Sequence, residues 1–203
     1  MSSEPDPILH VAMTIPRTEA EGPGVRFAVW VQGCPMRCAG CCNPEMLSFT
    51  PREAVSALRA SALVGQCLAT DAEGVSFLGG EPFAQADGLA AVARGVRAAG
   101  RSVMVFSGYT LDELRAMDAP GVAELLAHTD LLVDGRYEAS QRTTTRRWVG
   151  SDNQVMHFLT DRYTPLDPRF HEGNHLEIRL RHGEITLNGW PALGRNTRLG
   201  PAR

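Results

Sequence analysis

Short apolar runs alternate with polar, glycine-rich connections along most of the chain. Each run is rich in β-branched or aromatic residues and too short for an ordinary helix, which indicates strands. The run over residues 26–31 has no polar position after its first residue, as is typical of a strand buried on both faces. We therefore expect strands over residues 8–15, 26–31, 74–78, 101–106, 131–133 and 155–159.

The connections between these strands carry helix signals. The sequence Thr-Pro-Arg-Glu over residues 50–53 combines an N-cap, a first-turn proline and a capping box, and predicts a helix over about 51–63. An alanine-rich stretch over about 84–99, ended by a glycine, predicts a longer helix. A second capping pattern over 110–113 predicts one or two short helices before Thr129.

The alternation of strand and helix predicts an α/β fold. Short connections between repeated strand–helix units favour parallel βαβ units with right-handed crossovers. A complete (β/α)8 barrel takes about 250 residues, and this chain has 203. We therefore expect a partial, open (β/α) barrel or a twisted parallel sheet.

The end of the chain follows a different pattern. Residues 175–180 and 184–188 alternate with a period of two on either side of a short turn, which predicts a β-hairpin. Residues 191–203 are rich in Gly, Pro and Arg and are expected to form a loose tail. We expect a core over residues 1–160 and a C-terminal extension, with hairpin and tail, over 161–203.

Composition restricts the classes of function. A hydrophobic content of 43% supports one globular domain, and a net charge of −3 gives no basic excess for nucleic acid or an anionic membrane. No apolar stretch approaches the roughly 20 residues that span a bilayer, and the acidic start of the chain does not resemble a signal peptide. We expect a protein of the cytoplasm, where thiols stay reduced, with no nucleic-acid or membrane partner.

Four of the five cysteines lie together directly after the strand over residues 26–31. Cys34, Cys38 and Cys41 have the spacing C-x3-C-x2-C, so their thiolates can converge on one soft metal centre. A structural zinc site and an ordinary ferredoxin cluster each take four protein ligands. Cys42 is a poor fourth ligand because adjacent side chains point in different directions. A cluster held by three cysteines keeps one iron open for a substrate.

A zinc site completed by a distant ligand is the alternative for the same three cysteines. Cys67 is one such ligand, although an isolated cysteine of this kind is more often a small buried apolar residue. The six histidines show no metal-ligand spacing such as H-x-x-x-H. Spacing alone leaves both the cluster and the zinc ion open.

The cysteine spacing resembles that of the radical S-adenosylmethionine (radical SAM) superfamily. The stretches Glu-Gly-Pro-Gly-Val-Arg-Phe over 21–27, Gln-Gly-Cys-Pro over 32–35 and Gly-Cys-Cys-Asn-Pro-Glu over 40–45 are similar to the activating enzymes of anaerobic ribonucleoside-triphosphate reductase, a family of glycyl-radical enzyme activases. An aromatic residue or histidine usually follows the third cysteine in that family, and Cys42 stands there in this chain. The resemblance extends over about 21–159.

The resemblance implies both the cofactors and the reaction. It implies a [4Fe-4S] cluster bound by Cys34, Cys38 and Cys41, with an open iron that chelates the amino and carboxylate groups of SAM. One electron then cleaves SAM to methionine and a 5′-deoxyadenosyl radical, which abstracts hydrogen from the target. Radical generation requires no catalytic acid or base, so no catalytic residue of that kind is expected.

The sequence Gly79-Gly80-Glu81-Pro82 follows a predicted strand and resembles the motif that holds the methionine end of SAM. Two glycines let the backbone approach a ligand closely, and carbonyl groups together with the Glu81 carboxylate can receive an ammonium group. The alternatives are a plain strand-to-helix connection and, for Glu81, a role in ordering the loop.

Three further residues are expected on the cofactor side. Ser107 and Asp134 follow parallel strands, whose carboxyl ends meet at one rim, although a helix cap or a turn would explain each equally well. Asn153 belongs to a segment with Arg147, Trp148 and Gln154 that resembles a late motif of the same family. Its amide suits SAM or the backbone of an inserted peptide.

The resemblance also implies partners. The leading hypothesis is a glycyl-radical enzyme, most simply an anaerobic ribonucleotide reductase, with a flavodoxin or ferredoxin type of electron donor. The second hypothesis is a radical SAM enzyme that acts directly on a small molecule or peptide. A non-enzymatic iron–sulfur or zinc binding module is the third. The shortest family members do not need the extension beyond about residue 161.

Overall fold

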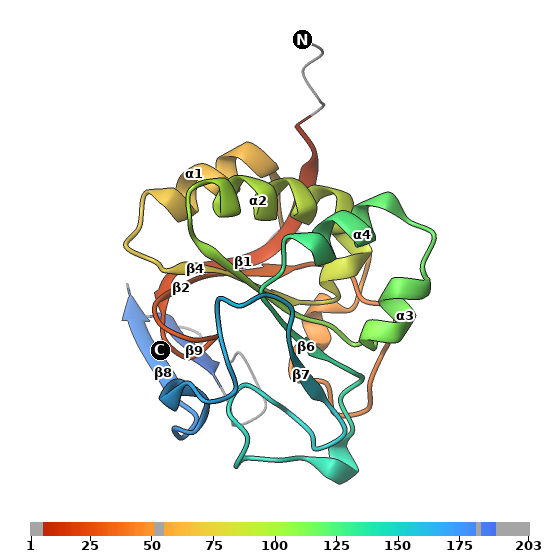
Figure 1. The fold of residues 1–203 in the computed structure, drawn as a ribbon, viewed down its shortest axis with the longest axis vertical. Helices are drawn as coiled ribbons and strands as arrows, with labels where there is room; N and C mark the ends of the chain where they lie inside the picture. Colours follow the sequence, from red (N-terminus) through yellow and green to blue (C-terminus); the bar gives the residue numbers. More distant parts are fainter. Residues whose placement is uncertain (1–5, 51–54, 182–183, 190–203) are drawn as a thin grey trace.

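The structure is a computed structural model that describes residues 6–50, 55–181 and 184–189. Its largest element is a seven-stranded mixed sheet with helices over one face (Figure 1). The strand order is β3-β1-β2-β4-β5-β6-β7. The strands are β1 (Ile8–Thr18), β2 (Arg26–Val31), β3 (Ser56–Arg59), β4 (Gly74–Gly79), β5 (Ser102–Phe106), β6 (Leu131–Asp134) and β7 (Val155–Phe158).

The centre of the sheet confirms the expected parallel α/β arrangement. Strands β2, β4, β5 and β6 pair in parallel, whereas β1 runs antiparallel to β2 and β7 runs antiparallel to β6. Parallel neighbours need a long crossover, usually a helix. The connection from β6 to β7 contains only the short 3-10 helix η3 (Ala139–Gln141), which fits the antiparallel return of β7. The sheet is therefore mixed.

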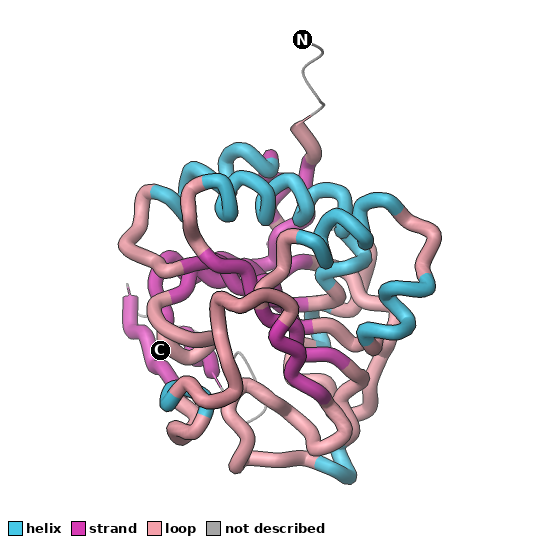
Figure 2. Tube along the Cα trace, in the orientation of Figure 1, coloured by secondary structure: helices cyan, strands magenta, loops and turns pink. Residues whose placement is uncertain are grey.

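Helices α1, α2 and α4 cover the same face of the sheet (Figures 1 and 2). In α2 the buried Leu89, Val92, Ala93 and Val96 recur at helical spacing, so one stripe of the helix packs on the sheet. The α-helices are α1 (Ala60–Leu68), α2 (Ala86–Ala98), α3 (Leu111–Ala116) and α4 (Pro120–Ala127). The other 3-10 helices of the described residues are η1 (Pro44–Met46), η2 (Pro82–Gln85) and η4 (Pro168–Phe170).

The central strands place alternate side chains on opposite faces of the sheet. Val29 and Val31 of β2 belong to the large core beneath the helices, whereas Trp30 belongs to a separate cluster on the other face. Phe77 and Leu78 of β4 divide in the same way. The face without α1, α2 and α4 thereby receives the side chains that floor the site described below.

Two helix starts predicted from capping patterns have different outcomes. The pattern at Thr110 is confirmed, because Glu113 N donates to Thr110 Oγ1 at 3.2 Å and Thr110 N donates to Glu113 Oε2 at 2.8 Å. The predicted helix over 51–63 is wrong for residues 56–59, which form β3 and pair with β1. Residues 51–54 lie outside the described part of the chain.

The first helix begins instead at Ala60, and its cap comes from far along the sequence. Asp6 accepts hydrogen bonds from Ser61 N at 3.0 Å and from Ser61 Oγ at 2.6 Å. The acceptor lies 55 residues before Ser61 in the sequence. Pairing with β1 holds the preceding residues extended and overrides their local helix signal.

The predicted hairpin is confirmed as β8 (Leu176–Arg181) and β9 (Glu184–Gly189), which pair antiparallel. It is attached to the end of β1 and to the connection between β1 and β2. Asn188 Nδ2 donates to Thr18 Oγ1 at 2.9 Å, and Gly189 N donates to Glu21 Oε1 at 2.8 Å. The predicted tail lies outside the described residues. None of the helices described has the length and apolarity that a membrane crossing requires.

Candidate cluster and cofactor site

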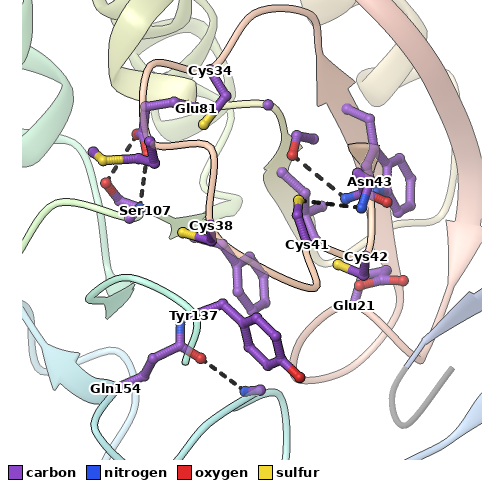
Figure 3. A pocket seen from close by; sticks show the side chains of 18 of the residues that line it. Glu21, Cys34, Cys38, Cys41, Cys42, Asn43, Glu81, Ser107, Tyr137 and Gln154 are labelled. Atoms are coloured by element: carbon purple, nitrogen blue, oxygen red, sulfur yellow. Dashed lines mark hydrogen bonds between the residues drawn. The ribbon is translucent and has the colours of Figure 1, made fainter. Parts of the chain in front are cut away.

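A pocket of about 230 Å³ opens at the carboxyl ends of β2, β4 and β5 (Figure 3). Trp30, Leu78 and Phe106 are the inward residues of these three strands and form its apolar floor. The loops after the strands and the C-terminal hairpin supply the walls. The remaining lining residues are Ala20, Glu21, Cys34, Met36, Cys38, Cys41, Cys42, Asn43, Gly79, Gly80, Glu81, Ser107, Gly108, Gly135, Tyr137, Trp148, Gly150, Gln154, Asn188 and Gly189.

The loop after β2 brings the three predicted cluster ligands to this pocket, because Cys34, Cys38 and Cys41 all line it. Backbone hydrogen bonds fix both ends of the loop: Gly33 N donates to Met46 O at 2.9 Å and Cys34 N donates to Leu47 O at 3.2 Å. The loop thus returns to its own start, with its thiols at the pocket.

The thiols of the loop have unequal proton affinities. A hydrogen bond with Cys42 lowers the pKa of Cys41, which favours the thiolate that a metal requires. The same contact raises the pKa of Cys42, and burial raises the pKa of Cys34. Cys42 also lines the pocket, beside Glu21 (Figure 3).

The structure excludes Cys67 as a fourth ligand beside the three cysteines of the loop. Cys67 is 0% exposed within α1 and belongs to the core beneath the helices, so it does not reach the pocket. Its predicted burial is confirmed. Among the described residues, no three His, Cys, Asp or Glu side chains are gathered closely enough to hold a single ion. This includes Cys34, Cys38 and Cys41, so the observation does not distinguish a zinc ion from a cluster.

The turn after β4 packs directly against the cysteine loop. Gly80 N donates to Val31 O and Glu81 N donates to Gly33 O, each at 2.8 Å. Gly79 has a φ of 107°, and a Cβ on it would lie 2.5 Å from Val31 N. A Cβ on Gly80 would lie 2.2 Å from Gly33 O. Only glycine fits at these two positions, which makes the turn a close backbone cradle beside the thiols.

Glu81 joins three segments beneath this turn. Its Oε1 accepts from Phe83 N at 3.0 Å and from Ser107 Oγ at 2.9 Å, and its Oε2 accepts from Gly108 N at 2.7 Å. Its side chain is almost fully buried, and burial raises its pKa to about 7 against these hydrogen bonds. Glu81 therefore orders the loop, as one of the sequence interpretations proposed, and also lines the pocket.

The other predicted cofactor residues divide between the pocket and its surroundings. Ser107 lines the pocket, and its hydroxyl donates a hydrogen bond to Glu81. Asp134 is not among the lining residues: its Oδ2 accepts from Leu111 N at 2.6 Å, at the start of α3, and lies 2.8 Å from His157 Nε2. Asp134 thus occupies the position of a helix cap, which was one of the alternatives for it.

Asn153 also lies outside the lining of the pocket, and its neighbour lies within it. Asn153 Nδ2 donates to Arg136 O at 2.8 Å, whereas its buried Oδ1 has no partner in the structure. Gln154 lines the pocket, accepting from Gly150 N at 2.9 Å and donating to Gly135 O at 2.8 Å. This amide braces two parts of the connection between β6 and β7.

Several lining residues were not predicted from the sequence as site residues. Glu21 is buried, and burial raises its pKa to about 7 while Asn188 and Gly189 donate to its Oε1. An acidic residue in a glycine-rich turn was the available signal for Glu21. For Asn188 no local signal existed, because its place depends on how the hairpin docks. Tyr137 completes the wall beside Gln154 (Figure 3).

The residues present fit an iron–sulfur cluster with a small organic ligand. Three soft thiols and a side-chain-free cradle open on one pocket, and the apolar floor supplies a surface for a flat organic group. Soft thiolate donors suit iron–sulfur clusters. The hydrogen bonds between the cysteine loop and the glycine turn hold the two parts of such a site in one position.

Comparisons with known proteins agree with this geometry. The family model described as a 4Fe-4S single cluster domain matches residues 20–157. Proteins named anaerobic ribonucleoside-triphosphate reductase-activating protein are similar to the chain. That of Salmonella typhimurium is 31% identical over 144 residues, covering 68% of this chain and 91% of the relative. That of Escherichia coli K12 is 29% identical, with the same coverage.

More distant similarities extend this set. The phage T4 protein of the same name is 25% identical over 144 residues, covering 69% of this chain and 88% of its own length. Among solved structures, QueE from Escherichia coli aligns with a TM-score of 0.42 at 19% identity, over 51% of this chain and 54% of QueE.

Proposed function

We propose that this chain installs a glycyl radical on an anaerobic ribonucleotide reductase. The chain belongs to the 4Fe-4S single cluster domain family and to the radical SAM family of anaerobic ribonucleoside-triphosphate reductase-activating proteins, and this membership is the basis of the proposal. It is a radical SAM enzyme, and its cofactors are a [4Fe-4S] cluster and SAM. The non-enzymatic module considered from the sequence is therefore set aside. The partner and the site residues named below belong to the proposal.

In this proposal Cys34, Cys38 and Cys41 hold the cluster, and the turn formed by Gly79 and Gly80 receives the methionine end of SAM. The reduced cluster and SAM together supply a 5′-deoxyadenosyl radical at the pocket. The backbone of the turn approaches the ligand because neither glycine carries a side chain. Glu81 and Ser107 keep the turn in place, and the apolar floor excludes water from the reacting centre.

Asp134 and Asn153 have supporting positions in this proposal. Asp134 fixes the start of α3, which follows β5, and Asn153 holds the chain after β6 through Arg136 O. A direct contact of either side chain with SAM stays a prediction. So do the flavodoxin or ferredoxin type of electron donor, the cytoplasmic location, and a partial, open barrel as the finer description of the sheet.

One observation carries the proposal above the others. The three-cysteine loop and the Gly79–Gly80 turn come from different strands, yet they are hydrogen-bonded to each other at the mouth of one pocket. A structural metal site would need the thiols alone. The adjacent cradle adds a place for a second ligand.

Electron paramagnetic resonance tests the proposed function. Anaerobically reconstituted protein, SAM and reductant are incubated with the cognate anaerobic ribonucleoside-triphosphate reductase, and we expect a glycyl radical signal on the reductase. A reductase in which the acceptor glycine is replaced by alanine is the control and should give no signal. Release of 5′-deoxyadenosine without any radical on the reductase would contradict the activase role and favour direct action on a small molecule or peptide.

A further inference from the structure

The C-terminal hairpin has the opposite orientation to an ordinary surface hairpin. In an amphipathic sheet the apolar face usually packs on the core and the polar face meets water. Here the polar face meets the body of the protein. Strand β8 alternates strictly, with Glu177 and Arg179 on one face and Leu176, Ile178 and Leu180 on the other.

Hydrogen bonds attach the polar face to the end of β1 and to the connection that follows it. Glu19 N donates to Glu177 Oε1 at 2.7 Å, and Arg179 donates to Arg17 O at 2.6 Å. Asn188, which pairs with Glu177 across the hairpin, donates to Thr18 Oγ1. The hairpin is thus held in place without burying the apolar side chains of β8.

The apolar face consequently remains open. Leu176, Ile178 and Leu180 are 41%, 66% and 72% exposed, respectively. The register places Leu187 beside Ile178 and Ile185 beside Leu180, on the same face. Leu187 and Ile185 are half-buried, and they flank the three exposed side chains of β8. Together these five branched apolar residues form a patch on one face, and an exposed apolar patch commonly marks a site of protein contact. We call these five residues the hairpin patch.

The hairpin patch begins at the pocket. Gly189 lines the pocket and is the register partner of Leu176, the first residue of the patch. From there the exposed side chains follow β8 away from the pocket, over about 13 Å between Leu176 and Leu180 at strand spacing. A protein that places a segment in the pocket along this wall would therefore lie beside the patch.

We propose that the hairpin patch is a docking surface for the glycyl-radical enzyme partner, which presents an apolar surface next to the segment that carries its glycine. This inference rests on the proposed function, which requires a protein segment to reach the pocket. The family match ends at residue 157, so the hairpin lies outside the part of the chain that the family model describes. Its rigid attachment at Thr18 and Glu21 fixes the patch relative to the reacting centre.

Binding of the purified reductase to wild-type protein and to variants tests this surface. Ile178→Glu combined with Leu180→Glu places two charges in the patch, and we expect the dissociation constant for the reductase to rise at least about tenfold. Ile178→Val with Leu180→Met keeps the patch apolar and should bind as the wild type does. Leu166→Glu changes an apolar residue that is 87% exposed elsewhere and is the matched control.

Release of 5′-deoxyadenosine without reductase should be unchanged in all three proteins, which shows that the pocket remains intact. Equal affinity of wild type and the doubly charged variant would overturn the inference. So would a wild-type dimer that the same variant dissociates, because a second copy then covers the patch. Hydrogen exchange of the backbone amides in the hairpin patch gives a further test. If removal of residues 190–203 raises the exchange rate of these amides and addition of the reductase does not change it, the C-terminal end of the chain itself covers the patch. That result would also overturn the inference.

The binding measurement needs neither SAM nor reductant, so it is independent of the chemistry. Absence of a glycyl radical on the wild-type pair contradicts the proposed function. Equal dissociation constants of the charged variant and its controls for the reductase would contradict the docking surface and leave the proposed function untouched.

Discussion

The Ser107 hydroxyl donates a 2.9 Å hydrogen bond to Oε1 of Glu81, and this buried contact joins the end of β5 to the turn after β4. The same carboxylate receives two backbone amides. Three donors on one buried group fix the turn that carries Gly79 and Gly80 relative to the end of β5. The first prediction follows from this contact.

Ser107→Ala should remove one of the three donors to a buried carboxylate. We expect the free energy of unfolding to fall by about 1–3 kcal/mol, because a buried acceptor loses one of its hydrogen-bond donors. We also expect the KM for SAM to rise, because the turn is held less firmly. Urea denaturation and SAM-dependent kinetics measure the two effects. Ser140→Ala, at an exposed position, should change stability by less than about 0.5 kcal/mol. Equal effects of the two substitutions would show that the contact has no role.

Gly80→Ala tests the close approach between the glycine turn and the cysteine loop. The added Cβ would lie 2.2 Å from Gly33 O, so the backbone must move. We expect a destabilisation of about 1–3 kcal/mol and a drop of about tenfold or more in the rate of SAM cleavage. Thermal unfolding and the rate of 5′-deoxyadenosine release are the measurements.

Gly65→Ala is the matched control for that substitution. A Cβ on Gly65 meets nothing within 4 Å, and the residue lies inside α1. Alanine should there stabilise the protein by about 0.5–1 kcal/mol through its helix propensity, with SAM cleavage unchanged. If the two alanine variants behave alike, the cradle is not closely packed.

Glu21 should make stability depend on pH. Burial raises its pKa from 4.5 to about 7. Below pH 4.5 the carboxyl is protonated in both states. Between pH 4.5 and 7 the unfolded chain loses the proton first, so the free energy of unfolding falls as pH rises, by up to about 3 kcal/mol, and then levels off.

Glu21→Gln should remove this contribution, so that the variant loses less stability between pH 4.5 and 7 than the wild type. Urea unfolding of the metal-free protein at several pH values measures the difference between the two slopes. Glu81 titrates in the same direction in both proteins and cancels in this comparison. Parallel curves for the two proteins would contradict the raised pKa of Glu21.

Cys42→Ala distinguishes three protein ligands from four. Cys42 lies next to Cys41 and lines the pocket, but the proposal gives it no iron. We expect reconstituted Cys42→Ala protein to retain the wild-type iron and sulfide content, whereas Cys41→Ala should lose its cluster. Iron and sulfide analysis with visible absorption checks both. A cluster lost equally in the two variants would mean that the fourth iron is protein-bound.

Local patterns were sufficient where a segment's own side chains determine its structure. The apolar runs of β2, β4, β5 and β6 and the capping box at Thr110 formed as predicted. The strand at residues 56–59 did not, because its pairing with β1 depends on a segment nearly fifty residues away. The capping of α1 by Asp6 is non-local in the same sense.

The site shows the same division. The cysteine spacing and the glycine pair identified the pocket because they depend on residue type at fixed spacing. Side-chain direction was not available from sequence: Asp134 turns to the start of α3, and Gln154 faces the pocket beside its neighbour Asn153. The arrival of Asn188 from the hairpin depends on docking between segments more than 160 residues apart.

Release of 5′-deoxyadenosine from SAM by the reduced, anaerobically reconstituted protein tests the central claim most directly. We predict release by the wild type and by Cys42→Ala, and none by Cys34→Ala, Cys38→Ala or Cys41→Ala. Release that persists after any one of those three substitutions, or a wild type that binds a cluster but leaves SAM intact, would contradict a three-cysteine cluster with an iron open to SAM.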